Sequence, residues 1–153
     1  WEGDTVIGAA HKHAIVTVIE RKSGFAVIAK VSRKTAEQVS NAIIERLAPL
    51  ACRVKSLTYD NGKEFAEHAK IDIALKSTSY FADPFASWQR GTNENFNGLL
   101  RQYIPKKRHL SSVTDKELKM IEDRLNHRPR KRLGFKTPFQ VFYESLNRVA
   151  LHT

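Results

Sequence analysis

The chain has 153 residues, which suits one domain with a hydrophobic core of its own. Hydrophobic residues make up 41% of it and charged residues 27%, and no apolar run is long enough to span a bilayer, so the composition favours a globular protein. The formal net charge is +10, and residues 101–153 hold 13 Lys and Arg against 5 Asp and Glu. This basic last third predicts a polyanionic partner, with DNA or RNA ahead of a membrane surface. A solvated basic face without a partner remains the alternative.

The first third of the chain consists largely of apolar and β-branched runs, which predict strands. We expect strands at residues 4–7, 13–20 and 25–31. The short turn at 21–24 joins the last two strands into a hairpin. Because a hairpin is antiparallel, a sheet that contains it cannot be wholly parallel.

Helices become frequent after this hairpin. Thr35 with Gln38 has the form of a capping box and predicts a helix that ends near Leu47. The elements expected after it are a strand at 54–59, a short helix at 65–69, a strand at 77–81 and three helices that begin near Thr92, Thr114 and Pro138. This order predicts an α/β fold with a mixed five-stranded sheet flanked by helices.

Three acidic residues occupy informative positions. Asp4 lies inside the first strand, Asp60 ends the fourth, and Glu94 lies in the first turn of a helix. Each has an ordinary explanation: Asp4 could pair with a basic side chain, Asp60 could open an Asp-Asn-Gly turn, and Glu94 could complement the helix dipole. Together they point to chemistry, because a charge inside an apolar strand is costly unless it has a partner.

Three carboxylates are the ligands that phosphodiester chemistry on DNA or RNA requires. Two divalent ions about 3.5–4 Å apart can activate a water or hydroxyl and stabilise the leaving oxygen. Mg²⁺ prefers oxygen ligands, usually one or two carboxylates together with substrate phosphates and waters. Asp4, Asp60 and Glu94 are therefore candidate ligands, and Glu64 is a rival of Glu94 for the third position.

Three segments carry a family resemblance: Trp-Glu-Gly-Asp at 1–4, Tyr-Asp-Asn-Gly-Lys-Glu-Phe at 59–65 and Trp-Gln-Arg-Gly-Thr-Asn-Glu-Asn-Phe-Asn-Gly at 88–98. The chain resembles the DDE integrase core of bacterial insertion sequences, most closely the insertion-sequence-thirty family, and the 33 residues between Asp60 and Glu94 match the spacing of that family. The resemblance covers nearly the whole chain. It implies a ribonuclease H-like fold, with residues 1–153 as an integrase-type catalytic core.

The resemblance also implies an activity and a set of partners. Asp4, Asp60 and Glu94 would be the catalytic triad, and Mg²⁺ or Mn²⁺, two ions per site, the cofactor. The reaction would be cleavage at transposon ends followed by strand transfer. We further expect a homodimer or higher oligomer on DNA, no membrane association, and a cytoplasmic, nucleoid-associated location in a bacterium. Because an N-terminal helix-turn-helix region is lacking, we expect the chain to be a fragment of a longer protein.

Polar and basic residues around the triad are candidate DNA contacts, because such side chains position DNA through its phosphates. If Glu94 faces the ions, helical spacing brings Asn97 and Arg101 to the same side. The full set is Lys63, Gln89, Arg90, Asn93, Asn97, Arg101, Lys106, Lys107, Arg128, Arg130 and Lys131. Trp88 is expected to anchor the loop before Glu94, with base stacking as the alternative.

Three other functions remain open at this stage. A ribonuclease H-like nuclease would cleave without joining ends. A non-catalytic DNA-binding or assembly domain would bind DNA through residues 101–132 without metal-dependent cleavage. A basic interaction module without nucleic acid would fit the charge but would leave the buried position of Asp4 unexplained.

Overall fold

The computed structural model describes residues 1–150 and contains the five strands that the sequence predicts. The strands are β1 Glu2–Ile7, β2 Ala14–Ile19, β3 Ala26–Val31, β4 Ser56–Tyr59 and β5 Thr78–Phe81. The α-helices are α1 Ala36–Leu47, α2 His68–Leu75, α3 Gly91–Leu100, α4 Asp115–Asn126 and α5 Pro138–Ala150. Short 3₁₀ helices lie between them: η1 Ala48–Arg53, η2 Lys63–Phe65, η3 Ser87–Arg90, η4 Leu110–Ser112 and η5 Lys131–Leu133.

The sheet has the strand order β3-β2-β1-β4-β5. The pairs β1–β2 and β2–β3 are antiparallel, whereas β1–β4 and β4–β5 are parallel. The predicted α/β fold with a mixed five-stranded sheet is confirmed. Strand β1 is the central strand and the place where the pairing changes from antiparallel to parallel.

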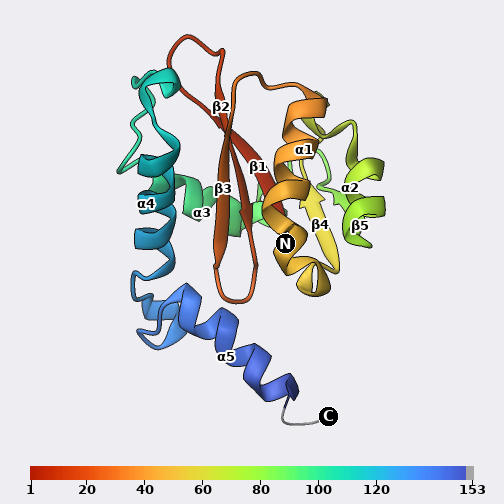
Figure 1. Ribbon diagram of the computed structural model, residues 1–153, viewed down its shortest axis with the longest axis vertical. Helices are drawn as coiled ribbons and strands as arrows, with labels where there is room; N and C mark the ends of the chain where they lie inside the picture. Colours follow the sequence, from red (N-terminus) through yellow and green to blue (C-terminus); the bar gives the residue numbers. More distant parts are fainter. Residues whose placement is uncertain (151–153) are drawn as a thin grey trace.

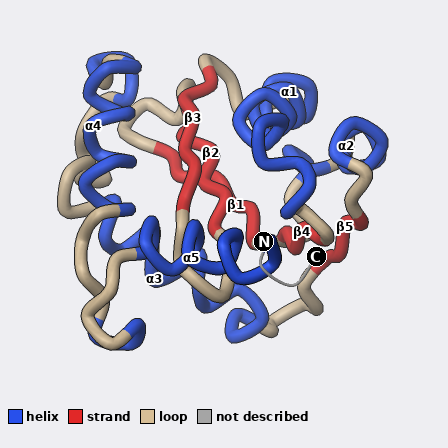
Figure 2. Tube along the Cα trace, turned by 60° about the horizontal axis from the view of Figure 1, so that its bottom comes forward, coloured by secondary structure: helices blue, strands red, loops and turns tan. Residues whose placement is uncertain are grey.

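Helices cover both faces of this sheet, so the molecule has three layers (Figures 1 and 2). Strand β2 contributes to both cores, because alternate residues of a strand point to opposite faces. Val16 and Val18 lie in the core that α1 and α2 close, and Ile15 and Ile19 lie in the core that α3 and α4 close. All six residues of β2 are buried.

The predicted helix starts are confirmed by their caps. The Thr35 hydroxyl accepts a hydrogen bond from the Gln38 amide, and the Thr114 hydroxyl accepts one from the Glu117 amide. Thr137 and Gln140 form a reciprocal cap. The Thr137 hydroxyl accepts a hydrogen bond from the Gln140 amide, and the Gln140 side chain accepts one from the Thr137 amide. Each cap satisfies amides that the first helical turn leaves free.

The prediction of a short helix at 65–69 is wrong in its position. The chain instead makes the 3₁₀ turn η2 and then α2, which begins at His68. Ile71 and Leu75, one helical turn apart, are the buried residues of α2, and they join the core under α1. The burial of these two side chains sets the position of the helix.

Side chains from α4 cover the backbone of the edge strand β3. The Asn126 carboxamide accepts a hydrogen bond from the Ala26 amide at 2.9 Å and donates one to the Ala26 carbonyl at 2.8 Å. The Glu122 carboxylate accepts a hydrogen bond from the Ile28 amide at 2.8 Å. An edge strand closed in this way is not available to pair with another chain.

Replacing Asn126 with Ala tests this edge closure. We expect a loss of about 2–4 kcal/mol in the free energy of unfolding, because the amide and carbonyl of Ala26 would both lose their buried partner. Urea denaturation measures the change. Arg124→Ala, at an exposed position of the same helix, is the control and should stay within about 0.5 kcal/mol of the parent. A similarly small effect for Asn126→Ala would show that the pairing contributes little.

Candidate active site

The pairing of β1 with β4 places two of the predicted carboxylates side by side. These parallel strands are in register at Glu2 and Thr58. Asp4 and Asp60 each lie two residues further along, so they are at the same level and on the same face. Neighbouring strands are only about 4.8 Å apart, and two carboxylates at that separation repel each other unless a cation lies near both.

Three neighbours contact the Asp4 carboxylate: the Thr5 amide, the Asn97 side chain and the Arg90 guanidinium. Its carboxylate accepts hydrogen bonds from the Thr5 amide at 2.8 Å and from the Asn97 side chain at 2.9 Å. Only 17% of the side chain is exposed. Burial raises the pKa of Asp4 above its ordinary value and the charge of Asp60 adds to this, while Arg90 and the two hydrogen bonds oppose it. The net effect is a raised pKa, because burial and the Asp60 charge outweigh Arg90 and the two hydrogen bonds.

Asp60 follows β4 directly and starts a tight turn. Its carboxylate accepts a hydrogen bond from the Gly62 amide at 2.8 Å. A Cβ at Gly62 would lie against the Asp60 and Glu64 carboxylates, so a larger residue here would push these two side chains aside. The next side chain, Asn61, donates to the Ala82 carbonyl at 3.0 Å and ties the turn to the segment that follows β5.

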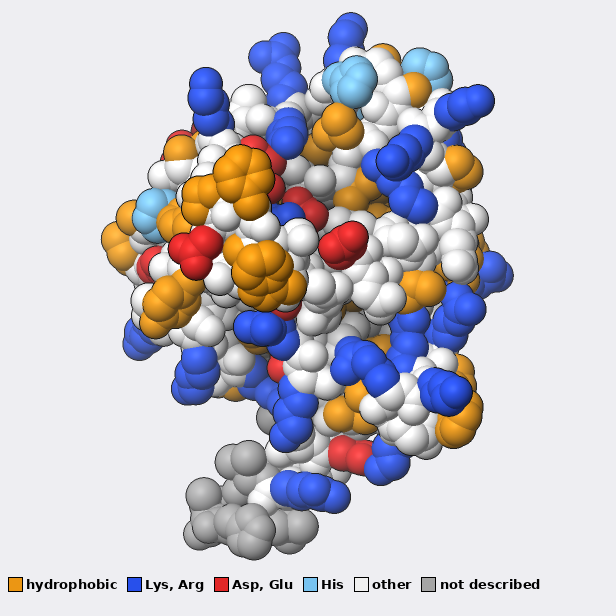
Figure 3. All heavy atoms as spheres, turned by 180° about the vertical axis from the view of Figure 1, so that it is seen from behind, with side chains coloured by type: hydrophobic (Ala, Val, Ile, Leu, Met, Phe, Trp, Pro, Cys, Tyr) orange, Lys and Arg blue, Asp and Glu red, His pale blue; other side chains and the backbone are white. Residues whose placement is uncertain are grey.

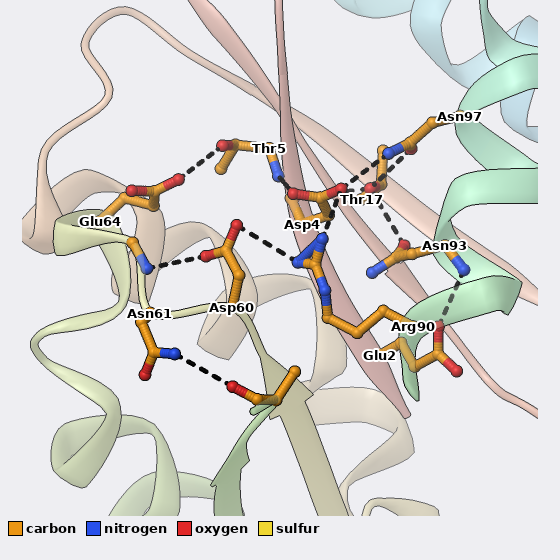
Figure 4. A network of polar contacts seen from close by, with 12 residues as sticks. Glu2, Asp4, Thr5, Thr17, Asp60, Asn61, Glu64, Arg90, Asn93 and Asn97 are labelled. Atoms are coloured by element: carbon orange, nitrogen blue, oxygen red, sulfur yellow. Dashed lines mark hydrogen bonds and ion pairs between the residues drawn. The ribbon is translucent and has the colours of Figure 1, made fainter. Parts of the chain in front are cut away.

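The Arg90 guanidinium lies between the two aspartates (Figure 4). It is 3.6 Å from an Asp4 carboxylate oxygen and 3.3 Å from an Asp60 carboxylate oxygen. Arg90 ends η3, immediately before α3 begins, so the loop before α3 supplies the cation that these carboxylates require.

Glu94, the third predicted ligand, is not brought together with the other two. It lies in the first turn of α3, and its side chain is exposed, whereas Asn93, Phe96 and Leu100 form the buried side of that helix. Within residues 1–150, no three His, Cys, Asp or Glu side chains gather closely enough to share a metal ion.

The rival ligand Glu64 is engaged elsewhere. Its carboxylate accepts a hydrogen bond from the Thr5 hydroxyl at 2.9 Å and pairs with the Lys34 ammonium at 2.8 Å. Burial alone would raise the pKa of Glu64, but the contacts with Lys34 and Thr5 outweigh burial and lower it. Glu64 therefore connects η2 to β1 next to Asp4.

Two buried polar residues of the site were not singled out from the sequence. Glu2 has no exposed surface; its carboxylate accepts the Asn93 amide at 2.9 Å and pairs with Arg21 at 3.0 Å. The Thr17 hydroxyl donates to the Asn97 side-chain carbonyl at 3.1 Å. Both fix α3 against the sheet. The sequence did contain a signal for Glu2, because residues two apart in a strand share a face and Glu2 therefore lies on the same face as Asp4.

Several predicted DNA contacts have partners inside the protein. Asn93 is fully buried, and Asn97 is bonded to Asp4, so both position the site. The Gln89 side chain bonds to Asp83. Arg101 is half-buried, donates to the Ile7 carbonyl at 2.7 Å, and has a pKa lowered by burial.

Of the other basic candidates, five are exposed and one, Arg130, is half-buried. Arg130 is half-buried and donates to the Leu125 carbonyl at 2.9 Å. The exposed candidates are Lys63, Lys106, Lys107, Arg128 and Lys131. Figure 3 shows acidic side chains near the middle of the face opposite to the view of Figure 1, with Lys and Arg side chains spread around them. This charge pattern fits a phosphate backbone that crosses an acidic centre.

The loop before α3 carries two exposed aromatic side chains. Phe85 is 99% exposed and has a positive φ of 63°, which a residue with a side chain rarely adopts. Trp88 is 76% exposed. The prediction that Trp88 anchors the loop is therefore wrong. The loop is instead closed by Gln89 and Asp83, which exchange two hydrogen bonds of 2.8 Å and 3.0 Å.

Comparison with known proteins identifies the relatives of this chain. It is 47% identical over 146 residues to a transposase for the insertion sequence element IS4351 from Bacteroides fragilis. It is 44% identical over 142 residues to the transposase InsI for the insertion sequence element IS30A of Escherichia coli (strain K12). The alignments cover 95% and 92% of this chain. The chain is therefore similar to insertion-sequence transposases, including those of the insertion-sequence-thirty family that its motifs resemble. No protein-family model matches it.

The chain spans less than half the length of these two curated relatives, 45% and 37% respectively. A solved structure, the catalytic core domain of BIV integrase, matches 98% of the chain and 97% of its own length with a TM-score of 0.69 and 24% identity. A simian T-cell lymphotropic virus intasome chain matches with a TM-score of 0.74 and 21% identity, covering 92% of this chain and 52% of its own. The predicted ribonuclease H-like fold is confirmed.

The carboxylate oxygens of this site fit a divalent cation. Asp4 and Asp60 offer oxygen ligands, which Mg²⁺ prefers. A positive group, the Arg90 guanidinium, already lies between them. Asp4 is partly buried, and this burial is the main cause of its raised pKa.

The pKa of Asp4 leads to a pH-dependent prediction. Since the pKa is raised above its ordinary 3.8, the folded chain binds this proton more tightly than the unfolded chain does. Asp4 therefore destabilises the fold once the pH exceeds its folded pKa, and has little effect below 3.8. Between about pH 4 and pH 7 in EDTA, the Asp4→Asn variant should gain stability relative to the parent. Urea denaturation checks this; a difference that shrinks with rising pH would contradict it.

Proposed function

We propose that this chain is the catalytic domain of a DDE transposase, which cleaves DNA at the ends of an insertion sequence and transfers the freed 3′ strand ends to a target. The observation that carries the proposal is the register of β1 with β4, which brings Asp4 and Asp60 to one cation. The transposase relatives, at 47% and 44% identity, support the same reaction.

In this proposal Asp4, Asp60 and Glu94 hold Mg²⁺ or Mn²⁺, two ions per site. When bound, these ions supply an activated water or hydroxyl and stabilise the leaving oxygen. Asn97 orients Asp4 through its 2.9 Å hydrogen bond. Glu2 and Thr17 fix α3 against the sheet, and with it the segment that carries Glu94.

The proposed partners are the DNA ends of the element and the target DNA. The exposed basic residues would contact their phosphates, since such contacts position DNA without reading its sequence. A homodimer or higher oligomer on DNA, in a bacterial cell near the nucleoid, completes the proposal. Among the described residues, no helix combines the length and apolar character needed to cross a membrane.

Mn²⁺-dependent cleavage and strand transfer on short DNA ends test the reaction. Glu94→Gln and Asp60→Asn should each lose at least about a hundredfold in rate, equivalent to about 2.7 kcal/mol of barrier, because each removes a metal-binding charge. Glu37→Gln, at an exposed glutamate near the start of α1, is the matched control and should keep full activity.

The outcomes of this assay separate the candidate functions. Cleavage without joining would indicate a nuclease that only hydrolyses. DNA binding without metal-dependent cleavage in any variant would indicate a DNA-binding or assembly domain. Equal activity in the parent, Glu94→Gln and Asp60→Asn would overturn the assignment of the triad.

The basic surface leads to a separate prediction about DNA affinity. Lys106→Ala combined with Lys107→Ala should weaken binding and reduce the slope of log affinity against log salt by about 1.8, because two phosphate contacts are lost. Fluorescence anisotropy with a labelled duplex at several salt concentrations measures both. Lys70→Ala combined with Lys76→Ala removes two exposed lysines of the α2 region and is the control. An equal effect of the two pairs would mean that the protein has no localised DNA surface.

A further inference from the structure

The ion pairs of Arg90 are loose compared with others in the protein. Its Nη1 atom is buried and makes no hydrogen bond within the described chain. Arg108, in contrast, donates two hydrogen bonds of 2.6 Å and 2.8 Å to Glu117. A buried donor without an acceptor costs about 1–3 kcal/mol. The guanidinium therefore contributes its charge to the two aspartates without the directional bonds that would fix it there.

The aspartates nevertheless need a cation at this place. Asp4 is 17% and Asp60 42% exposed, and their strands run side by side. The remaining contacts of the two carboxylates come from neutral groups, namely the Thr5 amide, the Asn97 side chain and the Gly62 amide. The Lys34 ammonium pairs with Glu64 and with neither aspartate. Within residues 1–150, Arg90 is the one basic side chain that forms an ion pair with either aspartate.

Arg90 is mechanically linked to the exposed loop. It ends η3 and directly precedes α3, with no side-chain cap at that junction. Gln89 and Asp83 close the loop into one unit by two hydrogen bonds. Trp88, two residues from Arg90, projects from this unit and is 76% exposed. A displacement of the guanidinium would therefore move the segment that carries Trp88.

We infer that Arg90 is a positioning residue that occupies the place of a divalent ion between Asp4 and Asp60 and exchanges with that ion. In the metal-free protein the guanidinium holds the two carboxylates in register. Binding of the ion releases Arg90 together with the loop, and the freed guanidinium then serves the phosphate of a DNA substrate. The inference rests on the proposed function for the identity of the ion, but it concerns a step before any reaction.

The exchange predicts that removal of Arg90 strengthens metal binding. An internal cation that occupies the site in about nine-tenths of the molecules reduces the apparent metal affinity about tenfold. Arg90→Gln should therefore bind Mn²⁺ at least about tenfold more tightly than the parent, measured by electron paramagnetic resonance of free Mn²⁺. Measurement at about 0.3 M salt suppresses general charge effects. Lys55→Gln removes an exposed positive charge just before β4, at a residue with no role in the site, and is the control, with an expected change below about twofold.

The linked loop provides a second measurement. The chain has two tryptophans, and Trp1 is buried, so Trp1→Phe leaves the exposed Trp88 as the sole fluorophore. Addition of Mg²⁺, which does not quench by itself, should shift the Trp88 emission in this background. The shift should be absent when Arg90→Gln is added, because the loop is then already released. A shift of equal size with and without Arg90 would overturn the coupling between ion and loop.

The outcomes distinguish this inference from the proposed function. Unchanged or weaker Mn²⁺ binding by Arg90→Gln would overturn the exchange, even if the parent cleaves DNA. Tighter Mn²⁺ binding in a protein that fails to cleave would support the exchange and count against the catalytic assignment. No Mn²⁺ binding in either protein, with both folded by circular dichroism, would overturn both.

Discussion

The structure depends on one constraint, the parallel pairing of β1 with β4 in a register that aligns Asp4 with Asp60. Because strands of a sheet are about 4.8 Å apart, this register forces two carboxylates together in a partly buried place. Charges in such a place persist only with a compensating cation. The features around the site, from the Asn97 hydrogen bond to the Arg90 contact, answer this requirement.

The fixed side of the site and its adjustable side are built differently. Strand β1, strand β2 and helix α3 are joined by buried hydrogen bonds among Glu2, Thr17, Asn93 and Asn97. These bonds resist displacement because a broken one would leave buried polar groups unpaired. Glu94 is exposed on the same helix, and Arg90 lies at its start. Asp4 is therefore held by α3 through Asn97, whereas Glu94 is exposed and Arg90 contacts the aspartates without a hydrogen bond from its Nη1 atom.

Much of the fold follows from local sequence signals. The hairpin of β2 and β3 and the helix caps at Thr35, Thr114 and Thr137 are determined by neighbouring residues, so the sequence predicts them correctly. The start of α2 was misplaced because its position depends on the burial of Ile71 and Leu75 under a helix distant in sequence. Local patterns do not contain that information.

The site was predictable in its residue types and not in its contacts. The motifs select Asp4, Asp60 and Glu94, but 55 residues separate the two aspartates, so the sequence does not reveal the register of their strands. The Arg90 contact depends on that register and on the path of the loop, so basic character alone suggested a role at DNA. The exposure of Trp88 was hidden for a similar reason, because the Gln89 and Asp83 side chains close the loop without it.

The charge arrangement explains why an arginine, with its diffuse charge, suits this position. A DNA backbone attracted by the exposed lysines and arginines would meet repulsion from the acidic side chains near the middle of that face. A guanidinium beside both carboxylates reduces that repulsion and, being weakly hydrated, tolerates partial burial without ideal hydrogen bonds. A small divalent ion with the same ligands compensates both charges more completely. The same electrostatic demand therefore favours Arg90 in the metal-free protein and its replacement when the ion is present.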